Sequence, residues 1–184
     1  MPLTGITSLQ SQTDSTRPGN DVIDLMATQK IRSGPIRIPS HEEYEAFDGA
    51  HCKNLYAGLP PQWSCPGCGR SRYQIMRWTV IYPKRPDRHE GWAGGLHTHH
   101  DHGGDVPGRF FGGPAARFQP VVICEQCNSA DGTAKRKLGL PSQFSFAPWE
   151  IRQFVEATPH GFHVIDYSKA ELIYRQLFNL PSSA

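Results

Sequence analysis

The stretch HTHHDH, residues 97–102, carries four histidines and one aspartate in six positions. Imidazole nitrogens bind divalent metal ions and exchange protons near neutral pH, and a neighbouring carboxylate binds the same ions. An isolated histidine-rich run is more often a surface tract that binds transition metals loosely. What this run can do therefore depends on the residues that the fold brings to it.

Four cysteines flank the run in two C-x-x-C pairs, Cys65 with Cys68 and Cys124 with Cys127. Each pair supplies two thiolates from one tight turn, and two pairs complete the tetrahedral ligand set of a structural zinc ion. Cys52 makes the total odd, which argues against a disulfide framework. The sequence predicts one structural zinc site, with a redox role for the pairs as an alternative.

Asn128 follows the second pair directly. A zinc ion that joins both pairs would bring the end of the strand at the histidine run close to the helix that starts after Cys127, so His99, His100, Asp101 and Asn128 can converge. This set suits metal-assisted hydrolysis of a phosphodiester, because an ion held by two or three protein groups keeps positions open for phosphate oxygens. A neutral histidine beside it is a suitable base for water.

The first cysteine pair is followed by HxxHDH and then by CxxCN, with an acid and a glycine shortly after. This order of motifs resembles the HNH nucleases, also called ββα-metal or His-Me finger nucleases. The branch it resembles is that of phage recombination endonuclease VII, over about residues 62–138. The resemblance implies structural zinc on both cysteine pairs and a catalytic Mg²⁺ or Mn²⁺ ion on His99 and Asn128, with Asp101 available as a third ligand. It implies that His100 is the general base and that DNA is cut to 5′-phosphate and 3′-hydroxyl ends.

His99 stands where this branch of the family carries aspartate. Other HNH nucleases use histidine there, so the departure changes ligand softness and metal preference. It also leaves a second register open, in which Asp101 is the ligand and His102 the base. RNA stays open as a substrate, and a homodimer is expected from the resemblance alone. The rival hypothesis is a non-catalytic, zinc-dependent module or regulator that binds nucleic acid.

The sequence predicts that these residues are positioned by an α+β fold of short helices, strands and long loops. At 184 residues and 38% hydrophobic content, we expect a flexible arm over residues 1–35 and one zinc-stapled domain over 36–184, with a ββα-metal core near 62–138 and an extension over 140–184. Periodicity and capping boxes predict strands over 72–83, 96–100, 120–123 and 162–167, and helices over 40–56, 133–138, 148–158 and 168–178.

The net charge of +2 does not by itself indicate a nucleic-acid partner, so the relevant signal is local clustering of basic residues. Basic residues gather between positions 70 and 137, where a phosphate backbone would attract them. The predicted DNA contacts are Arg109, Arg117, Lys135, Arg136 and Lys137. The sequence shows no signal peptide and no apolar run of membrane-spanning length, so we expect an intracellular, cytoplasmic protein with no membrane partner.

Overall fold

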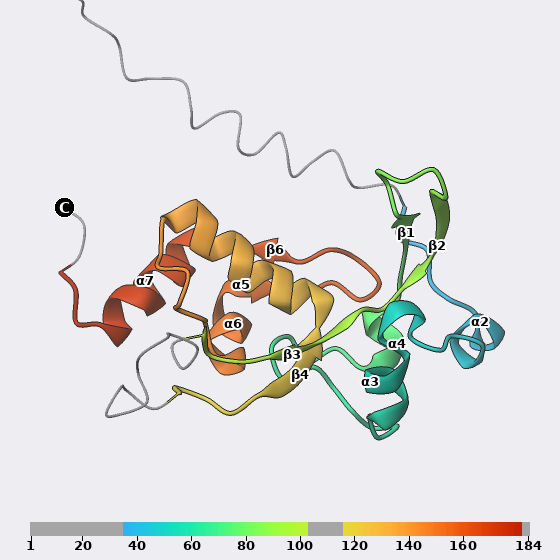
Figure 1. The fold of residues 1–184 in the computed structure, drawn as a ribbon, viewed down its shortest axis with the longest axis horizontal. Coiled ribbons are helices and arrows are strands. Elements are labelled where there is room, and N and C mark those ends of the chain that lie inside the picture. The colour runs from blue at the N-terminus through green and yellow to red at the C-terminus, as the bar shows by residue number, and fades with distance from the viewer. Residues whose placement is uncertain (1–34, 103–115, 182–184) are drawn as a thin grey trace, which may run out of the picture. The chain divides into compact units, whose positions relative to one another are not determined.

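The computed structural model of the chain describes residues 35–102 and 116–181, which fold as a mixture of short helices and two-stranded antiparallel sheets (Figure 1). They belong to one unit, Ile36–Ala184, apart from Pro35. The predicted arm lies outside the described residues except for its last position, and so does Arg109. The α+β class expected from the sequence is confirmed.

The helices are α2 (His41–Glu45), α3 (Lys53–Gly58), α4 (Arg72–Ile75), α5 (Glu125–Leu138), α6 (Pro148–Phe154) and α7 (Tyr167–Leu177), with a 3-10 turn, η1, at Ala50–Cys52. The strands are β1 (Arg77–Ile81), β2 (His89–Ala93), β3 (Leu96–His99), β4 (Val121–Cys124), β5 (Val155–Glu156) and β6 (Val164–Ile165). They pair in sequence order, β1 with β2, β3 with β4 and β5 with β6.

The hairpin β3–β4 leads directly into α5, and the helix packs against both strands (Figure 1). The register places Leu96 opposite Cys124 and His99 opposite Val121. β-branched residues favour β4, and Cys124 is both its last residue and the N-cap of α5, so no loop separates strand from helix. The histidine run therefore includes the end of a strand that packs against a helix, as the sequence predicted, but α5 begins at Glu125 and not at the predicted Thr133.

The first predicted helix, over 40–56, is broken in the structure. Its capping box is present, with the Ser40 hydroxyl accepting from the Glu43 amide, but α2 ends at Glu45. Gly49 then adopts φ +87°, and a Cβ there would lie 2.5 Å from Tyr56 Cβ. This left-handed turn lets α3 fold back with Tyr56 buried, which a continuous helix would not allow.

Two further expectations about secondary structure are wrong. The predicted strand over 72–83 begins with α4, because Ser71 and Gln74 form a capping box that starts a helical turn before β1. The segment 84–95, read from the sequence as a loop, contains β2, which pairs along the whole of β1. Cross-strand packing of Trp78 and Trp92, whose ring centroids lie 5.2 Å apart, stabilises this hairpin.

The C-terminal helices cover α5 and complete the core. α6 and α7 pack against α5 and against each other, and their buried side chains include Ile151, Phe154 and Ile173. The last helix starts on Asp166, whose carboxylate accepts from the Lys169 amide, and not on the capping box predicted at Ser168. Within the described residues, no helix combines the length and the apolar character needed to cross a bilayer.

Candidate metal centres

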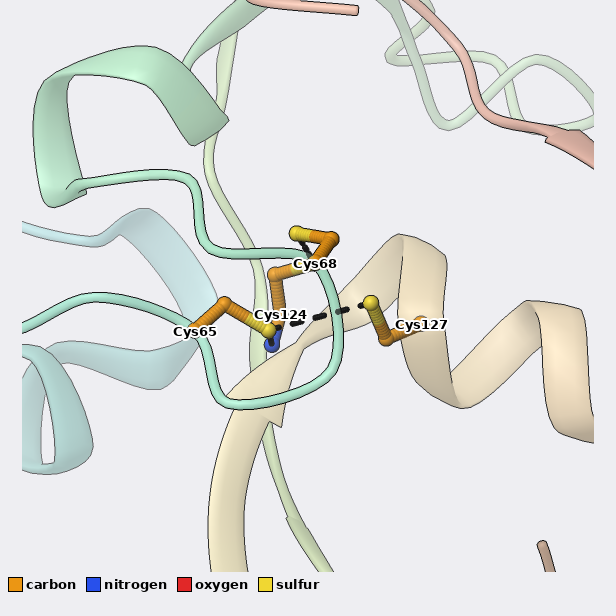
Figure 2. Close-up of side chains that lie close together, drawn as sticks. All are labelled: Cys65, Cys68, Cys124 and Cys127. Atoms are coloured by element: carbon orange, nitrogen blue, oxygen red, sulfur yellow. Dashed lines mark hydrogen bonds between the residues drawn. The ribbon is translucent and has the colours of Figure 1, made fainter. Parts of the chain in front are cut away.

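The two cysteine pairs meet although 56 positions separate Cys68 from Cys124. Figure 2 shows Cys65 and Cys68 on one loop, Cys124 at the end of β4 and Cys127 in the first turn of α5. The Sγ atoms of Cys65 and Cys127 lie 3.7 Å apart and those of Cys68 and Cys124 3.8 Å apart. All four sulfurs lie within 4.8 Å of one another, and none is in a disulfide.

These separations fit a tetrahedral zinc ion. Four thiolates at about 2.3 Å from a common centre lie about 3.8 Å from one another. Within the part of the chain that the structure describes, these cysteines are the one group of three or more His, Cys, Asp or Glu side chains whose donor atoms converge. This four-cysteine cluster could therefore hold zinc, as the sequence predicted.

The turn at residues 65–69, the first knuckle, is shaped by backbone hydrogen bonds and by glycine. The Cys65 carbonyl accepts from the amides of Cys68 and Gly69, and Gly69 has φ +76°, a left-handed conformation that glycine adopts at little cost. Gly67 faces the second pair, where a Cβ would lie 3.0 Å from Cys127 Sγ. Both glycines of CPGCG are therefore needed. Gly69 lets the chain turn, and Gly67 leaves room for the sulfur of Cys127.

Arg70 lies beside the sulfurs and is 3% exposed. Its guanidinium donates to Cys124 Sγ at 3.5 Å, and it forms no ion pair with a carboxylate among the described residues. A buried cation without an anionic partner costs several kcal/mol. The thiolates of a metal-bound four-cysteine cluster supply that anion, since four of them around a divalent ion carry a net charge of −2.

The pKa values of the four thiols shift in opposite directions within the cluster. Hydrogen bonds from neighbouring thiols lower the pKa of Cys68 and of Cys124, whereas the thiols of Cys65 and Cys127, which act as donors to Cys124, have a raised pKa. Burial disfavours the charged form of Arg70, but attraction by Cys124 and Cys68 raises its pKa overall. Even before a metal ion binds, the cluster therefore favours thiolate at two of its four sulfurs.

His99 and Asn128 form a second candidate centre. His99 is 2% exposed at the end of β3, and its Nδ1 lies 3.3 Å from Oδ1 of Asn128 in the first turn of α5. Its ring stacks on Phe118 with the centroids 5.2 Å apart. The structure thus brings together two of the predicted ligands of the catalytic ion, which lie 29 positions apart in the sequence.

The other nitrogen of His99 fixes the state of the ring. Nε2 lies 2.8 Å from the Phe146 carbonyl oxygen, which can only accept, so Nε2 carries a proton. In a neutral ring Nδ1 then presents a lone pair to Asn128 Oδ1, which is also an acceptor. Two acceptors that face each other repel. A cation bound between the two atoms would remove this repulsion, and so would a rotation of the Asn128 amide that turns its NH2 group toward Nδ1. Metal-binding histidines commonly donate their second nitrogen to a carbonyl in this way.

Asp131, three residues after Asn128, supports this arrangement from α5. Its Oδ1 accepts from the Phe146 amide at 2.8 Å, and its Oδ2 forms an ion pair with Lys135 Nζ at 2.8 Å. Lys135 also donates to the Phe144 carbonyl. The Asp131 carboxylate is buried, and it holds the segment whose carbonyl orients His99.

His100, Asp101 and His102 continue the chain beyond β3. His100 is half-buried, and its ring lies 4.4 Å from that of His102. Asp101 is buried and its Oδ2 accepts from the Arg117 amide at 2.8 Å. The roles of His100 as base and Asp101 as third ligand, and the alternative register with His102, stay predictions.

The predicted DNA contacts differ in how free their charges are. The Arg117 guanidinium binds the Ser145 carbonyl and forms an ion pair with buried Glu150, and the Lys135 ammonium is held as described above. Both cations are thus neutralised within the fold and are poorly placed to bind phosphate. Arg136 and Lys137 lie on the last turn of α5, where their side chains reach solvent.

His163 is a residue beside the four-cysteine cluster that sequence reasoning missed. Its Nε2 lies 3.4 Å from Cys127 Sγ and 3.9 Å from Cys124 Sγ. Burial favours the neutral ring, but hydrogen bonds to the sulfurs of Cys124 and Cys68 raise the pKa of His163 overall. No spacing signal could have identified it, because it lies 36 positions beyond Cys127.

A scan against protein-family models, a search of curated proteins and a search of solved structures each returned no match. What the two centres can do therefore follows from their own residues and geometry.

Proposed function

We propose that this protein is a metal-dependent DNA endonuclease whose hairpin–helix unit, β3–β4–α5, is stapled by zinc on the four-cysteine cluster. The observation that carries the proposal is the pairing of His99 Nδ1 with Asn128 Oδ1 at 3.3 Å. These two donors come from the strand and the helix that the cysteine pairs join. The order of strand, strand and helix supports the resemblance to HNH nucleases that the motifs suggest.

His99 and Asn128 would hold the catalytic ion, Mg²⁺ or Mn²⁺, with Asp101 as a third ligand. Two ligands at about 2.1 Å from one ion lie about 3.0 Å apart at a right angle and about 3.4 Å apart at a tetrahedral angle. The observed 3.3 Å falls within that range. When bound, such an ion polarises a phosphoryl oxygen and stabilises the charge on the leaving 3′ oxygen.

The chain's own groups would supply positioning and proton transfer. The Phe146 carbonyl keeps the Nδ1 lone pair of His99 directed toward Asn128. His100 follows His99 directly at the end of β3, and a ring nitrogen of His100 would take the proton from the attacking water. Arg136 and Lys137 would contact the DNA backbone, because their charges reach solvent about two helical turns beyond Asn128.

One observation favours a second candidate function, a zinc-dependent nucleic-acid-binding module without catalysis. In the described residues the histidine run does not form a second cluster of three His, Cys, Asp or Glu donors beside the cysteines. In such a module, His99 and Asn128 would serve only to join β3 to α5, with the Asn128 amide donating to Nδ1.

The deciding experiment is nicking of supercoiled plasmid by the full chain with added Mg²⁺ or Mn²⁺, comparing wild type with His100→Ala. We expect nicking by wild type and a loss of about 10²–10⁴-fold in His100→Ala, the usual contribution of a general base. His41→Ala, an exposed histidine of α2, is the matched control and should nick as wild type does.

Zinc content, unfolding temperature and DNA affinity are measured on the same samples. The nuclease proposal requires that His100→Ala keep all three. If wild type binds DNA and zinc but cuts neither plasmid, branched DNA nor RNA with either metal, the binding module is the correct function. If His100→Ala cuts as fast as wild type and His102→Ala does not, the alternative register is correct.

A further inference from the structure

The loop between β5 and β6 packs across both halves of the four-cysteine cluster. This loop, residues 157–163, joins elements far from the cysteines in sequence (Figure 1). The His160 amide donates to the Gln74 carbonyl and its Nδ1 lies 2.9 Å from the Met76 carbonyl, next to the first knuckle. His160 adopts φ +58° and is buried, so its conformation is fixed by these contacts.

Arg70 connects this loop to the sulfurs. One terminal nitrogen of its guanidinium, NH1, donates to the carbonyls of Thr158 at 3.1 Å and Gly161 at 3.2 Å. The other, NH2, donates to Cys124 Sγ. A single planar side chain thus binds two loop carbonyls on one edge and a cluster sulfur on the other, a fork geometry that lysine could not reproduce.

Gln126 connects the same loop to the second pair, from the position between Cys124 and Cys127. Its Nε2 donates to the Gly161 carbonyl at 2.9 Å, and its Oε1 accepts from the His163 amide at 2.8 Å. This two-point contact fixes the backbone at His163, whose Nε2 then lies 3.4 Å from Cys127 Sγ. The amide of one side chain therefore places the imidazole of another beside the sulfurs.

We propose that residues 157–163, through Arg70, Gln126 and His163, form the outer shell of the four-cysteine metal site and determine how firmly it retains its ion. Arg70 offsets part of the negative charge of the thiolates. His163 Nε2, which lies 3.4 Å from both Cys127 Sγ and the NH2 nitrogen of Arg70, would donate an N–H to a thiolate in the tautomer that carries its proton there. The proposal rests on the zinc assignment made above and is independent of nuclease activity. It makes the C-terminal part of the chain part of the metal site.

The expected size of the effect follows from other metal sites. Removing an outer-shell hydrogen bond to a metal ligand typically lowers metal affinity by about 10–100-fold. His163→Ala removes the donor itself and leaves the four cysteines intact. Gln126→Ala leaves His163 in place but removes its positioning, so its effect should be smaller and of the same sign.

The test measures zinc transfer from the full chain to a chromogenic chelator and competition for zinc at equilibrium. We expect His163→Ala and Gln126→Ala to release zinc faster and to bind it about 10–100-fold and a few-fold more weakly, respectively. His163→Gln, which keeps an N–H donor, should recover part of the loss. The matched controls are His41→Ala and Gln153→Ala, at exposed positions.

The spectrum of the cobalt-loaded protein separates an outer-shell role from a merely structural one. Loss of the N–H···S bond should shift the thiolate-to-cobalt charge-transfer band in His163→Ala and leave it unchanged in both controls. Because Arg70→Met could fail to fold, the His163 and Gln126 variants decide the proposal, with circular dichroism as the check on folding.

Zinc retention within about twofold of wild type and an unshifted cobalt band in both variants would overturn the proposal while the zinc assignment stood, since the outer-shell effect expected is at least about tenfold for His163→Ala. Wild type that binds no zinc would overturn the zinc assignment and the outer shell together. Wild type that holds zinc and shows the expected losses, yet never cuts DNA, would support the outer shell and refute only the nuclease.

Discussion

The ion pair of Asp131 with Lys135 allows a prediction whose magnitude can be worked from the structure. The side chains are 6% and 12% exposed, and the two charged atoms lie 2.8 Å apart. Removing one partner of a buried pair costs about 3–5 kcal/mol, because the other charge is left unpaired. Asp131→Asn keeps an oxygen for the Phe146 amide, and Lys135 keeps the Phe144 carbonyl, so we expect a cost at the low end of that range, about 3 kcal/mol.

A double-mutant cycle measures the pair itself. Lys135→Met should also cost about 3 kcal/mol, since it strands the Asp131 carboxylate, but the double variant should cost no more than either single one. The coupling energy should therefore be about 3 kcal/mol or more, at the upper end for interacting pairs. In a unit of this size each kcal/mol lowers the unfolding temperature by about 2–4 °C, so each single variant should melt about 6–12 °C lower.

Thermal and denaturant unfolding of the zinc-loaded chain is the assay, with Arg136→Met as the control at the next, exposed cation. The control should change stability by less than about 0.5 kcal/mol. Additive single effects, within about 0.5 kcal/mol, would refute the reasoning.

The same variants test the DNA interface: Lys135→Met should leave the salt dependence of DNA binding unchanged, whereas Arg136→Met should lower its slope by about 0.9 if Arg136 contacts phosphate.

Three further predictions follow from the cluster and the caps. Gly67→Ala should destabilise the chain by about 1–3 kcal/mol and speed zinc release, whereas Gly58→Ala, whose Cβ meets nothing within 4 Å, should do neither; thermal melts and chelator assays decide both. The folded pKa values of Cys68 and Cys124 lie below that of an ordinary thiol, so their thiolates stabilise the fold above that value and this contribution is lost as pH falls through the lowered values. Zinc should be released on acidification, because protons compete with it for the thiolates, and the same dye reads the release. The pKa of Asp166 is lowered mainly by the Lys169 amide, so Asp166→Ala should lower the melting temperature at neutral pH, and this difference should shrink as the pH falls through the lowered pKa of Asp166.

The parts of the fold that the sequence predicted well are those where residue type and spacing act locally. The strand at Leu96–His99, the helix stop at Gly139 and the meeting of the two cysteine pairs all follow from short patterns. The predicted secondary structure was wrong where two local sequence signals favour different structures. At Ser71 a capping box prevailed over apolar alternation, and after Cys124 the expected knuckle is the first turn of α5.

The supporting contacts of both centres could not be predicted, because each depends on a loop whose path is set by tertiary packing. Nothing in the spacing of Asp131 and Phe146 reveals that a carboxylate holds the carbonyl that orients His99. Likewise, His163 reaches the cysteines only because Gln126 and Arg70 bind the loop that carries it. The ligand types of a metal site can thus be predicted from the sequence, whereas the groups that support those ligands cannot.

The long insertion between the cysteine pairs is compatible with a stable site. Closing a loop of the 56 positions from Cys68 to Cys124 removes about 4 kcal/mol of chain entropy from the unfolded state in a cross-link model, against about 3 kcal/mol for a loop of about 15 residues. The cost of closure thus grows only slowly with length. A metal ion on the cluster therefore fixes both ends of the insertion. The segment from His99 to Asn128 is shorter, begins within the insertion and ends just after the second cysteine pair. The two centres are therefore expected to be coupled: zinc on the four-cysteine cluster would hold β3 close to α5 and favour an ion shared by His99 and Asn128, and that ion would in turn favour zinc binding.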